Sequence, residues 1–382
     1  MKTNNLYNRF ASFIFFLIGS FYTANQTLMV RAGNFLKLNN SEMGILISAG
    51  YIGSITTLVF FGMYADRYGK KIFKTVASVF SIVGVALIAF ASNFYMIFAG
   101  HFLMSGGMLG LENMTISLLE DNNKEKAGKQ IAIANLAFGI GAFISPAVIS
   151  IAIGKDSYRP VYILMTLLST FVFCVLLFFK SIKKFEVKSK EINRLVDIFS
   201  FLKNKIMLLS VISIIVYIAC EATILYWIKG YFSLLSSPGL SEIAVSIYWV
   251  MILVSRFVVS LFKDTKSTLT TFAAIGSIGI GIMAVSGIPA LSLVGVALAG
   301  FGFGPIYGGV LFLGGHQFPE KSAAAYSLLG LAGSLGGVFS QPLIGFALEF
   351  VSVRGVYYLV MALSVILIFA IGSMIKRERK SN

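Results

Sequence analysis

Long apolar stretches separated by short polar segments repeat along the whole chain. A helix needs about 20 apolar residues to cross a membrane, so each stretch is a candidate span. Twelve such stretches occur, at approximately 9–31, 44–64, 72–91, 94–118, 129–153, 160–180, 205–228, 240–262, 267–287, 290–314, 323–348 and 355–375. The pattern predicts an all-α membrane protein with twelve transmembrane helices.

Composition excludes a soluble enzyme. The 382 residues are 57% hydrophobic and 12% charged, whereas soluble domains carry about 25% charged residues. The first apolar stretch, Phe10 to Val30, lacks a small-residue cleavage site and is too long for a signal peptide, so we expect it to be the first span. Cys174 and Cys220 lie inside apolar stretches and indicate no disulfide framework.

The net charge of +15 is confined to the connections between spans and predicts their orientation. With both termini inside, 25 lysines and arginines fall on the inner side and 6 on the outer side. The outer six are Arg31, Lys37, Lys155, Arg159, Lys229 and Arg354. We therefore expect a multi-pass protein of the cytoplasmic (inner) membrane with both termini cytoplasmic. This basic charge requires no nucleic-acid partner.

The two halves of the chain repeat one another. Tyr22, Ala24 and Gln26 in the first predicted helix match Tyr217, Ala219 and Glu221 in the seventh. The fifth and eleventh helices share a second pattern: Gly139, Gly141 and Ser145-Pro146 match Gly333, Gly336, Gly337 and Ser340-Gln341-Pro342. We expect pseudo-symmetric six-helix halves, 1–180 and 205–382, joined by a cytoplasmic linker, 181–204, around a midplane site.

The connection between the second and third spans carries a specific motif. Its residues are Gly62-Met-Tyr-Ala-Asp66-Arg67-Tyr-Gly69-Lys70-Lys71. This closely resembles the loop signature of the major facilitator superfamily. The resemblance implies a conformational latch formed by Gly62, Asp66, Arg67, Gly69, Lys70 and Lys71; the alternative is a topology signal only. The second-half counterpart, Arg256 through Lys263-Asp264, is degraded.

Four further segments are similar to the fucose permease group of sugar–proton symporters. They are Gly106 to Asn113, Asn135 to Pro146, Tyr217 to Trp227, and Tyr248-Trp249 with Ser255-Arg256. This resemblance implies proton-coupled sugar transport. One position departs from it, because the group's symporters carry an acid in the first helix where this chain has Gln26.

Glu112, Glu221 and His101 are the candidates for proton coupling. An acid at membrane depth is costly and usually faces a cavity or a partner. His101, Ser105, Met108 and Glu112 are spaced to form one stripe on the fourth helix. Glu112 then either loads a proton or is a static partner for a cation such as Arg256. His101 either shuttles protons or hydrogen-bonds a neighbour. Glu221 either contacts the substrate or an ion or makes a structural hydrogen bond.

The candidates for substrate binding are polar or aromatic residues within spans. They are Asn25, Gln26, Asn113, Tyr217, Glu221 and Tyr307. Asn25 and Gln26 suit sugar hydroxyls but are equally the kind of residue that joins helices. We expect Gln26 and Glu221 to face each other across the cavity. Trp227 is expected to be an interfacial anchor, and Gln341 to satisfy a carbonyl freed by Pro342.

No enzyme motif, metal-ligand cluster or cofactor-binding loop is found, so neither a catalytic residue nor a cofactor is expected. The expected partners are a small-molecule substrate, protons and the lipid bilayer, and the expected state is a monomer. The predicted function is secondary active transport of a small polar solute, with a sugar first. Proton-driven efflux of lipophilic or cationic compounds is the alternative, and a non-transporting membrane sensor is the remote one.

The charge bias makes a testable prediction about topology. A single cysteine introduced at Ser189, in the central linker, should react with a membrane-impermeant thiol reagent only after cells are permeabilised. Labelling of intact cells would show that the linker is outside and that the orientation is reversed.

Overall fold

The computed structural model describes residues 2–123, 127–152, 158–178, 198–262, 265–318 and 322–381, all of them in helices or their connections. The α-helices are α1 (Lys2–Phe35), α2 (Asn40–Tyr68), α3 (Lys70–Ala89), α4 (Phe94–Asn123), α5 (Ala127–Ala152), α6 (Arg159–Phe178), α8 (Lys205–Leu234), α9 (Ser241–Ser260), α10 (Thr265–Val285), α11 (Pro289–Phe303), α12 (Ile306–Gly315), α13 (Ser322–Ala347) and α14 (Val353–Ser381). Two 3-10 helices, η2 (Ile198–Lys203) and η3 (Pro238–Leu240), precede α8 and α9.

Twelve helical stretches among these residues are long and apolar enough to cross a membrane. The predicted all-α class and the twelve spans are therefore confirmed. The packing separates two compact units. The first contains α1, α3 to α6 and α2 from Leu46 onward, and the second contains α8 to α14 together with the short segment Asn39–Ile45. Ser189 and most of the predicted linker lie outside the described residues.

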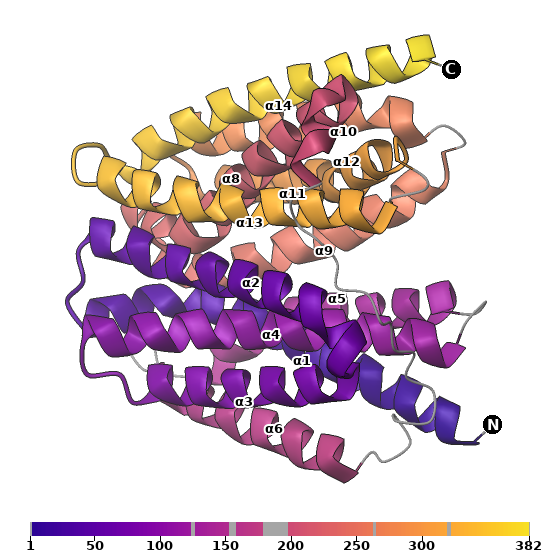
Figure 1. Ribbon diagram of the computed structural model, residues 1–382. Helices are drawn as coiled ribbons and strands as arrows, with labels where there is room; N and C mark the ends of the chain where they lie inside the picture. Colours follow the sequence, from indigo (N-terminus) through magenta and orange to yellow (C-terminus); the bar gives the residue numbers. More distant parts are fainter. Residues whose placement is uncertain are drawn as a thin grey trace. The chain divides into compact units, whose positions relative to one another are not determined.

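In the first unit, α3 lies alongside α4 and α6 (Figure 1). Glycines bring the backbones of α3 and α4 into contact. A Cβ added at Gly84 would meet the backbone nitrogen of Met104, and one at Gly100 would lie 2.9 Å from the carbonyl oxygen of Gly84. A Cβ at Gly107 would likewise meet the backbone of Ser81. Small residues at helix crossings are the usual means of close approach in membranes.

The second unit repeats this crossing between α10 and α11. A Cβ at Gly279 would lie 2.5 Å from the nitrogen of Ala299, one at Gly295 would lie 2.8 Å from the carbonyl oxygen of Gly279, and one at Gly302 would meet the backbone of Gly276. The three glycines follow those of the first unit at one constant spacing, since 279 − 84, 295 − 100 and 302 − 107 all equal 195. The chain is therefore a structural duplication.

Two arginines extend the same repeat. Nη2 of Arg159, at the start of α6, donates to the carbonyl of Ala91 just beyond α3, at 3.3 Å. Nη2 of Arg354, in the first turn of α14, donates to the carbonyl of Ser286 just beyond α10, at 3.1 Å. Each arginine satisfies a carbonyl that has no partner within its own helix, and the spacing is again 195 (354 − 159, 286 − 91).

One predicted span differs in form. The stretch 290–314 was expected to be a single helix, but α11 ends at Phe303 and α12 begins at Ile306. The interruption falls at Gly304-Pro305. Proline has no N–H group and its ring clashes with the preceding turn, so it breaks the ladder of hydrogen bonds there. The first unit has no proline at the equivalent place, and α4 is continuous.

The repeated crossing predicts matched stability losses in the two halves. Gly84→Ala and Gly279→Ala should each destabilise the protein by about 1–3 kcal/mol, because the added methyl group overpacks a backbone contact. The control is Gly372→Ala in α14, where a Cβ has nothing within 4 Å. Thermal unfolding in detergent would measure all three. A loss for Gly372→Ala as large as for the other two would contradict the assignment.

Candidate functional site

A buried chain of hydrogen bonds joins four helices of the first unit. The hydroxyl of Tyr162 (α6) donates to Oδ1 of Asn25 (α1) at 2.8 Å. Nδ2 of Asn25 lies 3.1 Å from Nε2 of His101 (α4), and Nδ1 of His101 lies 2.7 Å from the carbonyl oxygen of Leu46 (α2). We refer to the three side chains, together with the Leu46 carbonyl that ends the chain, as the α1–α4–α6 network.

The direction of each bond in the network follows from its two ends. The carbonyl of Leu46 only accepts, so Nδ1 of His101 donates and Nε2 accepts from the amide of Asn25. The oxygen of Asn25 is then free to accept from Tyr162. The network is satisfied with a neutral imidazole, and both ring nitrogens of His101 are occupied. Proton shuttling by His101 remains a hypothesis that requires this network to open.

Gln26 is the next residue after Asn25 but has no such partners. Its side chain is 2% exposed, and neither its Nε2 nor its Oε1 has a hydrogen-bond partner among the described residues. A buried amide left unsatisfied costs about 1–3 kcal/mol for each group. Gln26 therefore offers one donor group and one acceptor, held in a protein interior, to a polar ligand.

Glu112 lies apart from His101. The two residues are eleven positions apart on α4, a rise of about 16 Å at 1.5 Å per residue. His101 packs closely against α2, since a Cβ added at Gly50 would lie 2.6 Å from its imidazole ring. Glu112 is half-buried and makes no hydrogen bond or ion pair with another described residue, and the same holds for Asn113. The structure thus separates the predicted stripe into two places.

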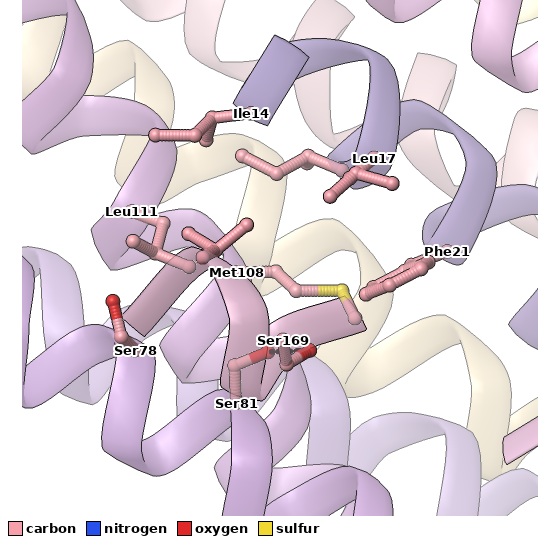
Figure 2. A pocket seen from close by; sticks show the side chains of 10 residues that line it. Ile14, Leu17, Phe21, Ser78, Ser81, Met108, Leu111 and Ser169 are labelled. Atoms are coloured by element: carbon pink, nitrogen blue, oxygen red, sulfur yellow. Dashed lines mark hydrogen bonds between the residues drawn. The ribbon is translucent and has the colours of Figure 1, made fainter. Parts of the chain in front are cut away.

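Met108, between these two places, lines an internal cavity of about 20 Å³ in the first unit (Figure 2). The hydroxyls of Ser81 and Ser169 point toward each other at one side of it, 3.5 Å apart, and the other walls are mostly apolar. A water molecule needs about 10–15 Å³, so this cavity has room for a water and not for a sugar. It is not the site of a transported solute.

The second unit places an acid among aromatic rings. The hydroxyl of Tyr217 donates to Oε1 of Glu221 at 2.6 Å, within one turn of α8. The Tyr217 ring lies 5.4 Å from that of Phe303 and 5.9 Å from that of Tyr307. Tyr217, Glu221 and Tyr307, all predicted substrate contacts, therefore come together in one cluster.

Arg256 lies beside this cluster. It lies inside the predicted span 240–262, within α9 and four residues before the helix ends at Ser260. Its Nε donates to the carbonyl of Gly304 at 3.1 Å, at the break between α11 and α12. The spacing of 195 matches Arg256 to Phe61, so it is not the second copy of Arg67. Gly304 directly follows Phe303, whose ring lies 5.4 Å from that of Tyr217, so the guanidinium lies near the cluster.

Two other expectations for α8 and α13 were wrong. Trp227 is 5% exposed and donates from Nε1 to Oε1 of Gln341 at 3.1 Å, so it is not an interfacial anchor. Gln341 bonds Trp227, and its Nε2 donates to Thr223 at 3.4 Å and to Ser340 at 3.1 Å, instead of satisfying a backbone carbonyl. These buried polar side chains form hydrogen bonds between helices because the lipid interior offers no other hydrogen-bond partner.

The loop motif forms a tight connection between α2 and α3. Gly69 has φ 119°, a conformation that side-chain-bearing residues rarely adopt. Nζ of Lys70 pairs with Asp121, at the end of α4, at 2.7 Å. The Arg67 guanidinium lies 5.4 Å from the Tyr68 ring. The side chain of Asp66 and its neighbour Gly62 lie outside the described part, so the latch remains a prediction.

Sequence reasoning missed Tyr162 and Asp121. Asp121 could have been found by charge complementarity, since it is an acid at the end of a span near a basic motif. Tyr162 gave no such signal, because an aromatic residue in an apolar stretch resembles ordinary core. Among the described residues, no three His, Cys, Asp or Glu side chains are grouped as metal ligands.

The network predicts different effects for two neighbouring tyrosines of the first unit. Tyr162→Phe should lower stability by about 1–3 kcal/mol, because Oδ1 of Asn25 loses its donor while buried. Tyr158→Phe, one turn earlier and equally buried, should cost little, since its hydroxyl has no hydrogen-bond partner among the described residues. Thermal unfolding of both variants measures the difference, and equal losses would argue against the network.

The chain matches the family model of the Major Facilitator Superfamily over residues 10–341. It is 26% identical over 168 residues to the multidrug resistance protein MdtG of Proteus mirabilis, covering 44% of this chain and 41% of that protein. The chain thus spans under half the length of this curated relative.

Solved structures are similar over almost the whole chain. A mutant of the nucleoside transporter NupG is 17% identical with a TM-score of 0.81, over 97% of this chain and 99% of that one. The fucose:proton symporter FucP of E. coli is 14% identical with a TM-score of 0.67, over 97% and 99% of the two chains. At these identities the likeness concerns the fold. With the family match over most of its length, this chain belongs to the Major Facilitator Superfamily, a family of membrane transporters and not of enzymes.

Proposed function

We propose that this transporter moves a small polar solute, a sugar or related metabolite, by alternating access, and that a proton gradient drives it through Glu112. The observation that carries the proposal is the isolation of Glu112, a carboxyl group in a membrane span with no partner among the described residues. The proposal includes the six-helix halves 1–180 and 205–382, the linker 181–204, and cytoplasmic termini in the inner membrane.

An unpaired carboxylate within a span is costly, by about 2.5–3.5 kcal/mol on insertion scales. Proton uptake neutralises the carboxylate, and exposure of the carboxylate to water removes the free-energy cost of burying its charge. A conformational change that alters the exposure of Glu112 therefore changes its proton occupancy. This linkage is what coupling of transport to a proton gradient requires.

Other polar groups have distinct roles in the proposal. Gln26 contacts the solute, because its amide is buried without partners. Asn25 positions Gln26 rather than binding solute, since both of its amide atoms are already engaged by His101 and Tyr162. Glu221, held by Tyr217, is a solute contact or a second titrating site, and Tyr307 and Asn113 complete the contacts.

The comparisons support a polar solute without naming it. One similar fold belongs to a protein described as a fucose:proton symporter and another to a nucleoside transporter. One comparison supports the alternative, efflux of drugs or lipophilic compounds: the sequence similarity to a multidrug resistance protein. A transport panel of sugars, nucleosides and lipophilic cations separates the two.

The test of coupling uses Glu112→Gln in proteoliposomes with an imposed pH gradient. The variant should lose accumulation of the solute found in the panel while keeping exchange, because the amide cannot carry a proton. The comparison should run between about pH 5.5 and 8, around the titration of buried carboxyl groups.

The matched control is Glu120→Gln, which removes the same charge from the exposed end of the same helix. This variant should accumulate solute normally. Equal accumulation by Glu112→Gln and the unmodified protein across the pH range would exclude Glu112 as the proton carrier.

A further inference from the structure

We propose that the Arg256 guanidinium is an anion-binding subsite in the second unit, and that it binds a carboxylate of the transported solute. This inference rests on the proposed function and narrows its solute class to cyclic acids, such as sugar acids or heteroaromatic carboxylates. It depends on the bond that holds Arg256, on the other N–H groups of its guanidinium, and on the residues around it.

The break between α11 and α12 fixes the guanidinium in place. Arg256 Nε donates to the Gly304 carbonyl at 3.1 Å. The first backbone bond of α12 runs from Gly309 N to Pro305 O, at 2.9 Å, one residue beyond Gly304. Arg256 lies within the candidate span Pro238–Val259. Its side chain thus donates to a carbonyl at the interruption of a different span. Its orientation is set by the backbone and does not depend on a flexible partner.

After that bond, the other four N–H groups of the guanidinium have no hydrogen-bond partner among the described residues. Arginine has five N–H donors and stays charged in proteins. Arg256 is exposed, and no carboxylate of the described residues lies within ion-pair distance of it. A charge inside a membrane span is retained only with a partner or a function. A carboxylate fits the two outer nitrogens in the paired geometry that arginine prefers.

The neighbours of Arg256 would recognise the rest of such a solute. The guanidinium is bonded to Gly304, the residue after Phe303, and the Phe303 ring lies 5.4 Å from the ring of Tyr217. Glu221 is held by the Tyr217 hydroxyl at 2.6 Å and is therefore oriented without pairing with Arg256. Its free oxygen accepts from a hydroxyl or ring N–H. The partly exposed ring of Tyr307, which lies 5.9 Å from the buried ring of Tyr217, offers apolar surface to a sugar or aromatic ring.

The experiment compares probes that differ only in charge. Thermal unfolding of the purified full-length protein is measured with glucuronate against glucose and with nicotinate against nicotinamide, since binding to the native state raises the unfolding temperature. In at least one pair the carboxylate should bind about tenfold more tightly, a difference of about 1.4 kcal/mol. Arg256→Gln should abolish that preference.

Two further variants separate the subsite from general effects of charge and folding. Arg354→Gln removes another arginine that donates to a backbone carbonyl, away from this cluster, and should keep the preference. Arg256→Lys keeps the positive charge but lacks the two outer nitrogens that pair with a carboxylate, so it should retain a weakened preference. This second variant keeps the test informative where Arg256→Gln does not fold.

Three results overturn the subsite. They are equal binding of both members of each pair by the unmodified protein, no binding of either carboxylate, and the same preference in Arg354→Gln and Arg256→Gln, whether both keep it or both lose it. The proposed function is judged separately. Glu112-dependent accumulation of a neutral sugar alongside no anion preference would leave the proposed function standing and remove only this subsite.

Discussion

The requirement that polar groups inside a membrane find partners governs this structure. The lipid interior supplies no hydrogen bonds, so a buried amide, hydroxyl or charge pairs within the protein or costs free energy. The α1–α4–α6 network, the Trp227–Gln341 pair and the arginines that donate to Ala91, Ser286 and Gly304 all follow this rule. Against that background, Gln26 and Glu112 are informative because neither side chain has a hydrogen-bond or ion-pair partner among the described residues.

Close helix crossings supply the frame in which these groups are held. Gly84 and Gly100 in one half, and Gly279 and Gly295 in the other, bring backbones together at the same spacing of 195. A crossing made of backbone contacts leaves little freedom for rotation about the helix axis. The faces that α4 and α11 present are therefore fixed, and with the face of α4 the direction of Glu112. The same spacing matches Glu112 to Tyr307, which lies beyond the interruption, in α12.

The sequence predicted the fold because its signals are regular. Apolar length predicted the spans, and the loop motif predicted the family. The site was harder, because spacing along one helix does not say which neighbour a face meets. His101 and Glu112 share a stripe, yet His101 packs on Gly50 while Glu112 lies about 16 Å along the helix. Arg256 lies inside the span predicted for it, but its bond to the Gly304 carbonyl could not be predicted, because apolar length does not show that the span 290–314 is interrupted.

The duplication also shows where the halves have diverged. The spacing of 195 matches Asn25 to Cys220 and His101 to Val296, and neither replacement can take part in a comparable side-chain network. Tyr357, matched to Tyr162, instead donates to the backbone of Ile224 at 3.4 Å. The first half thus holds α1 through a chain of side-chain hydrogen bonds, whereas the second holds α8 through the Trp227–Gln341 pair and a bond from Tyr357 to its backbone. The frames are alike, but their polar groups differ: among the described residues, one half has the Gln26 amide without a partner, and the other has Glu221 held by Tyr217.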